Sequence, residues 1–84
     1  MAGERKTKIE LIREAFDAAL DEKAKMHATP VAFKAKRLVV NVDSSSWMYE
    51  LNLKRPQICA GLNQKLKKEN IQINDIMFRI GEIQ

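Results

Sequence analysis

Apolar residues recur at steps of three and four between Thr7 and His27, and this spacing predicts one amphipathic helix. Within it, Asp21 and Lys25 stand four residues apart with the acid first, the order that favours an ion pair on a helix surface. We expect the helix to end before Pro30, because the residue preceding a proline avoids the helical region. Its buried stripe consists of Ile9, Ile12, Phe16, Ala19, Leu20 and either Lys23 or Met26.

After Pro30, apolar and polar residues alternate in two short runs, which predicts two β-strands. In the first run Val31 and Phe33 share one side. The link at residues 34–37 is short enough for a hairpin, so the two strands are expected to be antiparallel. It contains neither Gly nor Asn, and the type of turn therefore stays open. The second run is rich in β-branched residues, as in a central strand, and one side of it carries Leu38, Val40 and Val42.

Two helices and a last strand are predicted for the second half of the chain. Asp43 and the three serines after it form a helix start, since short polar side chains accept hydrogen bonds from free backbone amides. This helix is expected to run to about Leu53 or Lys54, and Pro56 suits the first turn of the next one. The expected buried positions are Trp47, Met48 and Leu51, then Ile58, Leu62 and Leu66, and finally Ile76, Phe78 and Ile80 in the strand.

The order of elements is therefore α-β-β-α-α-β, which predicts an α+β fold in two layers. The strands at Arg37–Asp43 and Asp75–Ile80 are joined through two helices, and a connection of that length permits a right-handed parallel crossover. A three-stranded mixed sheet with helices on one face accounts for every apolar stripe. This is the element order of the KH type II fold. Since 84 residues leave room for one core, we expect a single domain over residues 1–84.

The amino-acid composition indicates a globular protein with a basic centre. The chain is 45% apolar and 31% charged. No apolar run approaches the roughly 20 residues of a membrane span, and the first ten residues lack the apolar core of a signal peptide. The single cysteine suits a reducing compartment, so we expect a cytoplasmic protein without a membrane partner. Of the net charge of +4, the excess lies in Ala28–Asn70, where eight basic residues face three acidic ones; this favours a polyanionic partner.

Much of the chain resembles the DciA family of bacterial replication proteins. That family's pattern joins a strand, a Ser-Ser-x-Trp-x-x-Glu-Leu helix start, a helix with Leu-Asn and a terminal strand ending in Phe-Arg-x-Gly. The resemblance covers roughly Ile9 to Gly81, although Phe16 stands where tryptophan is usual and residues 27–30 match a His-Thr-x-Pro step loosely. The residues that carry it are Ser44, Ser45, Trp47, Glu50, Leu51, Leu62, Asn63, Phe78, Arg79 and Gly81.

The resemblance implies a KH-like fold, binding to single-stranded or forked DNA, and a role in loading or recruiting the replicative helicase. KH domains proper clamp a nucleic-acid backbone with a Gly-x-x-Gly loop, but here residues 54–57 read Lys-Arg-Pro-Gln. Lys54 and Arg55 would have to act through side-chain charge, with the amide end of the following helix adding partial positive charge. A solvated turn between helices explains the two residues equally well.

Three further cations, Lys34, Lys36 and Arg37, are expected together at the hairpin. They are candidates for phosphate contacts, and protection of the sheet edge against aggregation is the alternative. Tyr49 falls off the buried face of its helix and could stack a base, whereas Trp47 is expected in the core. The lysines at positions 65, 67 and 68 suit a helix C-terminus without any ligand.

No catalytic or metal-binding constellation is found in the sequence. His27 and Cys59, each the only residue of its type, cannot supply the four ligands of a zinc site, and His27 is expected to support the last carbonyls of its helix. The serine run has no histidine partner nearby, and three scattered glycines form no phosphate loop. We therefore expect a non-enzymatic nucleic-acid-binding module without a cofactor. A protein–protein interaction module and an RNA-binding KH relative are the alternatives.

Overall fold

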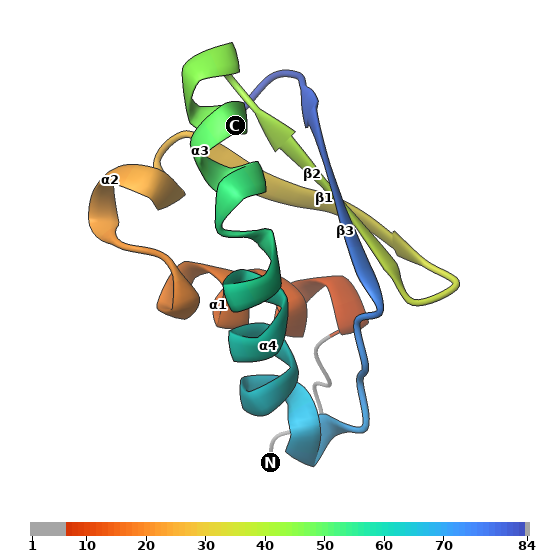
Figure 1. The fold of residues 1–84 in the computed structure, drawn as a ribbon. Coiled ribbons are helices and arrows are strands. Elements are labelled where there is room, and N and C mark those ends of the chain that lie inside the picture. The colour runs from red at the N-terminus through yellow and green to blue at the C-terminus, as the bar shows by residue number, and fades with distance from the viewer. Residues whose placement is uncertain (1–6, 84) are drawn as a thin grey trace, which may run out of the picture.

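The computed structural model describes residues 7–83, which form an α+β fold around a three-stranded mixed sheet (Figure 1). The elements are α1 (Lys8–Ala19), α2 (Glu22–Lys25), β1 (Ala28–Lys34), β2 (Arg37–Val42), α3 (Ser45–Leu53), α4 (Arg55–Leu66), the 3₁₀ turn η1 (Lys67–Glu69) and β3 (Asp75–Ile80). This confirms the predicted order, with α2 and η1 as short additions. Figure 1 shows the helices gathered to one side and the β1–β2 hairpin extending away from them. The ends of the predicted domain, residues 1–6 and 84, lie outside the described residues.

The predicted helix over Thr7–His27 is wrong in its second half, because the chain leaves the helix at Leu20 and starts a second, short helix. Leu20 has an extended backbone, with φ −106° and ψ 157°. The Asp21 carboxylate accepts a hydrogen bond from the backbone N–H of Ala24 at 2.8 Å and so caps α2. Asp21 therefore acts as a helix cap and not as the predicted surface partner of Lys25.

Strand β1 begins at Ala28, earlier than predicted, and contains a β-bulge. Its pairing with β2 shifts by one residue between Pro30 and Ala32, which leaves Val31 as the extra residue. The bulge changes which positions face the core. Ala28 and Pro30 are buried before it, whereas Phe33 packs against the core after it.

A two-residue turn joins β1 to β2. Lys34 and Arg37 face each other as the last pair of the ladder, so Ala35 and Lys36 alone form the turn. Both residues have positive φ, 53° and 63°, the pattern of a type I′ turn, which Asn and Gly usually adopt. The turn suits the twist of the strands, but each residue that carries a β-carbon in this region costs roughly 1–2 kcal/mol.

Strand β2 lies between the other two, antiparallel to β1 and parallel to β3, as the crossover through α3 and α4 predicts. Alternate residues of β2 and β3 are buried and form one core with the inner faces of α1, α3 and α4. Their neighbours in each strand are more exposed, which leaves the other side of the sheet uncovered. The core holds Ile12, Phe16, Leu38, Val40, Val42, Leu51, Ile58, Leu62, Leu66, Ile76 and Phe78.

Some positions that were predicted to be buried lie at the surface. Met26 is 68% exposed, and Lys23 is exposed as well, because the stripe of α1 ends where the chain breaks at Leu20. Ile80 is 55% exposed at the last position of β3. Trp47 is only half-buried against the edge of the core.

The segment between α4 and β3 is held by the side chain of Asn63. Its Nδ2 donates to the carbonyl oxygen of Ile73 at 2.9 Å, and its Oδ1 accepts from the backbone N–H of Ile73 at 2.7 Å. One amide thus satisfies both backbone polar groups of a residue whose side chain is buried. This contact fixes the chain just before β3 against α4.

Candidate nucleic-acid interface

The hairpin brings three of the predicted cations together at one end of the sheet. Lys34 and Arg37 are cross-strand partners, Lys36 sits in the turn between them, and all three are exposed. Asp75 pairs with one of them: its Oδ2 lies 3.8 Å from Nε of Arg37, and both side chains are more than half exposed. An exposed pair of this length contributes at most about 1 kcal/mol. The hairpin therefore keeps a local excess of positive charge.

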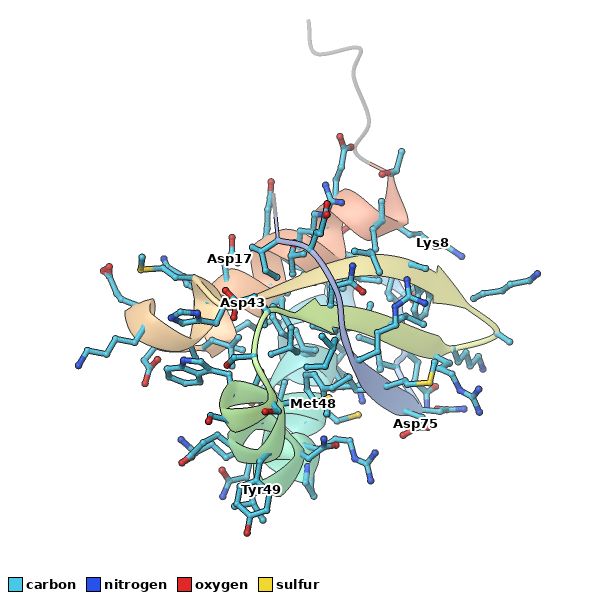
Figure 2. The ribbon with its side chains drawn as sticks, turned by 90° about the horizontal axis from the view of Figure 1, so that it is seen from above. Lys8, Asp17, Asp43, Met48, Tyr49 and Asp75 are labelled. Carbon is cyan, nitrogen blue, oxygen red and sulfur yellow. The ribbon has the colours of Figure 1, made fainter. Side chains whose placement is uncertain are left out.

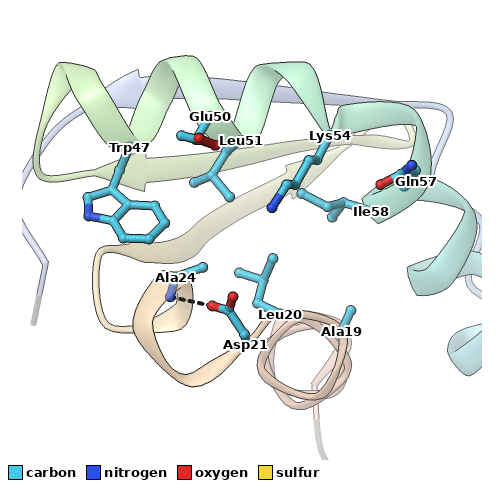
Figure 3. A pocket seen from close by; sticks show the side chains of 10 residues that line it. All are labelled: Ala19, Leu20, Asp21, Ala24, Trp47, Glu50, Leu51, Lys54, Gln57 and Ile58. Carbon is cyan, nitrogen blue, oxygen red and sulfur yellow. Dashed lines mark hydrogen bonds between the residues drawn. The ribbon is translucent and has the colours of Figure 1, made fainter.

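The two cations at the α3–α4 junction diverge, although they are neighbours in the chain. Arg55 turns toward β3, where Nη1 donates to the carbonyl oxygen of Ile76 at 3.4 Å. Lys54 faces the other way, into a hollow between the α1–α2 corner on one side and α3 with the start of α4 on the other. Figure 3 shows its ammonium group pointing toward Leu20 and Asp21. The hollow is lined by Ala19, Leu20, Asp21, Ala24, Trp47, Glu50, Leu51, Lys54, Gln57 and Ile58.

Asp75 lies between the hairpin and the α3–α4 junction, close to a cation from each. Arg37 approaches it from β2, and Arg55 lines a shallow groove with it between α4 and β3. In that groove burial raises the pKa of the Cys59 thiol, and Asp75 raises it further, against the opposing effects of Arg55 and Asn63. The Cys59 thiol donates to the carbonyl oxygen of Ile73 at 3.3 Å. Cys59 is thus a partly buried hydrogen-bond donor at the base of this groove.

Tyr49 is 67% exposed on the outer side of α3. Figure 2 shows it pointing away from the sheet, far from the end of β3 that begins at Asp75. Leu53, one turn further along α3, is 63% exposed on the same side. The structure therefore does not bring Tyr49 to the hairpin cations.

Sequence reasoning missed a contact of His27, which was expected to support helix carbonyls. Nδ1 of His27 lies 3.0 and 3.1 Å from the two carboxylate oxygens of Asp43, and the backbone N–H of Asp43 donates to the His27 carbonyl oxygen at 3.1 Å. The imidazole also stacks on Trp47, with ring centroids 5.1 Å apart and planes 14° apart. The register signals this contact, because Ala28 pairs with Val42 and the next residues outward are His27 and Asp43.

Within residues 7–83 no group of three or more His, Cys, Asp or Glu side chains is placed to hold a metal ion. None of the described helices is long and apolar enough to cross a membrane.

A family model described as Dna[CI] antecedent, DciA, matches residues 2–78, which is nearly the whole chain. The chain belongs to the DciA family. Membership indicates a role in DNA replication in association with the replicative helicase, and the family is of the helicase-loader type and not one of enzymes. No curated protein matches the sequence.

Several of the residues by which the chain resembles the DciA family hold the fold together. The hydroxyl of Ser44 accepts from the backbone N–H of Trp47 at 3.2 Å and caps α3, as predicted. Leu62 is buried and Asn63 holds Ile73. Gly81 leaves room for Asn41, since a β-carbon at position 81 would lie 2.6 Å from Cγ of that side chain. These residues are thus separate from the exposed cations of the hairpin, whereas Arg79, which also carries the resemblance, is itself an exposed cation on β3.

Proposed function

We propose that this DciA-family chain binds single-stranded or forked DNA in its helicase-associated role, with Lys34, Lys36 and Arg37 as the main contacts to phosphate. The observation that carries the proposal is the position of these cations on an exposed hairpin that extends beyond the helices. Among residues 7–83, the one acid paired with these cations is Asp75, through a long and solvated contact to Arg37. Cations at such a tip can contact the phosphates of a flexible nucleic-acid strand without contacting its bases.

We propose Arg55 as a fourth contact, because it lies on the same side of the molecule as the hairpin cations. It lines a groove with Asp75 at the start of β3, and Asp75 in turn pairs with Arg37. Lys54 and Tyr49 face other directions, so we propose them as separate, weaker contacts that a longer or forked DNA would reach. With about four phosphate contacts, the logarithm of the binding constant should fall with the logarithm of salt concentration at a slope of roughly −3.

The test is fluorescence anisotropy of a labelled oligothymidylate across a salt series. We expect the triple variant Lys34→Gln, Lys36→Gln, Arg37→Gln to weaken binding at low salt by at least about tenfold and to flatten the salt slope toward −1. The matched control is Lys65→Gln, Lys67→Gln, Lys68→Gln, which removes the same charge at the end of α4 and in η1. It should keep most of the affinity.

Three results would overturn the proposal: no binding by the parent chain at low salt, a flat salt response, or equal losses in the two triple variants. Circular dichroism of each variant checks that the fold is retained. Single replacements Arg55→Gln, Lys54→Gln and Tyr49→Ala then rank the remaining contacts, and we expect Arg55 to matter most.

DNA is proposed over RNA because the role of the family lies in DNA replication. For the same reason we propose the cytoplasm as the compartment of this chain. An RNA of identical sequence separates the two ligands, since only RNA offers the 2′-hydroxyl. Tighter binding of the RNA would favour an RNA-binding KH relative instead.

A further inference from the structure

The side of the sheet turned away from the helices, here called the open face, carries an apolar row between two polar rows. Ala32, Val39 and Met77 are direct partners in the register of the three strands, so they form one line across the sheet. None of them is fully buried, and Met77 is 40% exposed. The line lies in a shallow groove that Lys34, Ala35 and Arg37 also border.

Cations flank the apolar row on both sides. Toward the hairpin lie Lys34 and Arg37, with Asp75 beside Arg37. On the other side lie Asn41 and Arg79, which are partners in the parallel ladder. Arg79 has no salt bridge with any residue in the range 7–83. The open face therefore has a positive rim around an apolar centre.

The guanidinium of Arg79 is oriented before any partner arrives. Its Nε donates to Oδ1 of Asn41 at 2.8 Å, and Nδ2 of Asn41 donates to the carbonyl oxygen of Glu82 at 3.4 Å. The remaining N–H groups of Arg79 stay available for a carboxylate, which an arginine fork binds with two parallel hydrogen bonds. Fixing the side chain in advance lowers the entropy lost on binding.

The dimensions of the open face suit a helix. Three strands spaced about 4.8 Å apart span about 10 Å, which is also about the diameter of an α-helix with its side chains. Residues two apart in a strand are separated by roughly 6.6 Å, so cations lie about that far to each side of the apolar row. An amphipathic helix with an apolar stripe between acidic residues presents the complementary pattern.

A nucleic acid fits this surface less well, because no aromatic side chain is available to stack a base. Phe16 and Phe78 are buried, Phe33 packs against the core, Trp47 stacks on His27, and Tyr49 lies on α3. The apolar row would also gain nothing from phosphates. Met77 is instead the flexible, polarizable kind of residue that adapts to apolar anchors of protein partners.

We propose that the open face docks an acidic amphipathic helix of a protein partner, whose apolar anchors cover Val39 and Met77 and whose carboxylates pair with Arg79 and the hairpin cations. This surface is distinct from the phosphate contacts proposed above in its apolar row and in Arg79. The inference therefore does not depend on DNA binding, and each can fail without the other.

The probe is a stapled helical peptide of about 15 residues with leucines on one stripe flanked by glutamates. A second stapled peptide of equal composition, with the leucines dispersed around the helix, is the matched control. We expect the striped peptide to bind at least about tenfold more tightly, because only its leucines can reach the apolar row together. Amide chemical-shift changes should centre on β2 and β3.

Two kinds of variant separate the apolar and the charged contribution. The uncharged change Met77→Ser should weaken binding of the striped peptide about tenfold and leave oligothymidylate binding unchanged. Arg79→Gln should weaken the striped peptide about threefold or more. Lys65→Gln removes a charge at the end of α4, away from the open face, and is expected to leave binding of the striped peptide unchanged.

The proposal is overturned if both peptides bind equally, if Met77→Ser and Val39→Ser leave binding of the striped peptide unchanged, or if the shift changes lie on α3. Equal loss of peptide and oligonucleotide binding in Met77→Ser also contradicts it, because the two surfaces would then be one. Circular dichroism shows whether each variant remains folded.

Discussion

At the scale of single residues, the polar side chains of this protein fall into two groups: those that form hydrogen bonds within the fold and those that are exposed to solvent. Ser44, Asn63 and Asn41 are engaged with backbone or side-chain partners inside the described fold. Lys34 and Lys36 have no such partner among residues 7–83 and face solvent. The first group decides where elements begin and how they approach each other. The second group is free for ligands because the fold does not use it.

Replacing Asn63 with Ala should destabilise the protein by about 2 kcal/mol, because the N–H and carbonyl groups of Ile73 would both lose a partly buried partner. Urea denaturation measures the loss. Gln64→Ala, at the exposed neighbouring position of α4, is the control and should change stability by less than about 0.5 kcal/mol. Equal stability of Asn63→Ala and the parent would show that Asn63 does not hold the segment.

At the scale of elements, local chemistry predicted the strands and the helices from Ser45 onward, but not every boundary. The stripe of α1 continues past Leu20 in spacing, so a single helix was the simpler prediction. Asp21 fits both a surface ion pair and a cap, and the two roles differ only in the backbone around it. The bulge at Val31 could not be predicted from the sequence either. It alters the pairing of β1 with β2, and the residue types along β1 carry no sign of it.

The hairpin turn offers a direct test at this scale. Ala35→Gly should stabilise the protein by about 1 kcal/mol, because glycine adopts positive φ without the steric cost of a β-carbon. Ala60→Gly, at an exposed position inside α4, is the matched control and should destabilise by about 1 kcal/mol. Thermal and urea denaturation of both variants measure the two changes in stability. A destabilised Ala35→Gly would argue against a left-handed turn.

At the scale of the whole molecule, the tertiary structure separates cations that the sequence groups together. Lys54 and Arg55 are adjacent in the chain, yet one faces the α1–α2 corner and the other reaches β3. Arg37 and Asp75 are far apart in the chain, yet parallel pairing makes them neighbours. A single cradle formed by all six predicted residues is therefore not what the fold presents. Its cations gather chiefly at the hairpin.

Tertiary structure also brings together His27, just before β1, and Asp43, just after β2. We therefore expect their contributions to the free energy of unfolding to be coupled. In a double-mutant cycle of His27→Ala and Asp43→Ala, we expect a coupling energy of about 0.5–1 kcal/mol, modest because both side chains are partly exposed. Urea denaturation of the four proteins measures it. Strictly additive effects would mean that the contact contributes nothing to stability.

From the sequence alone, one can determine the order of the elements, the core positions of β2 and α4, the cap of α3 and the family, because periodicity, caps and motifs are properties of neighbouring residues. Only the tertiary structure decided the break at Leu20, the bulge at Val31, the divergence of Lys54 from Arg55 and the apolar row of the open face. These features depend on strand register and on how elements pack. Register and packing are set by energies summed over contacts between distant parts of the chain, which no local pattern contains.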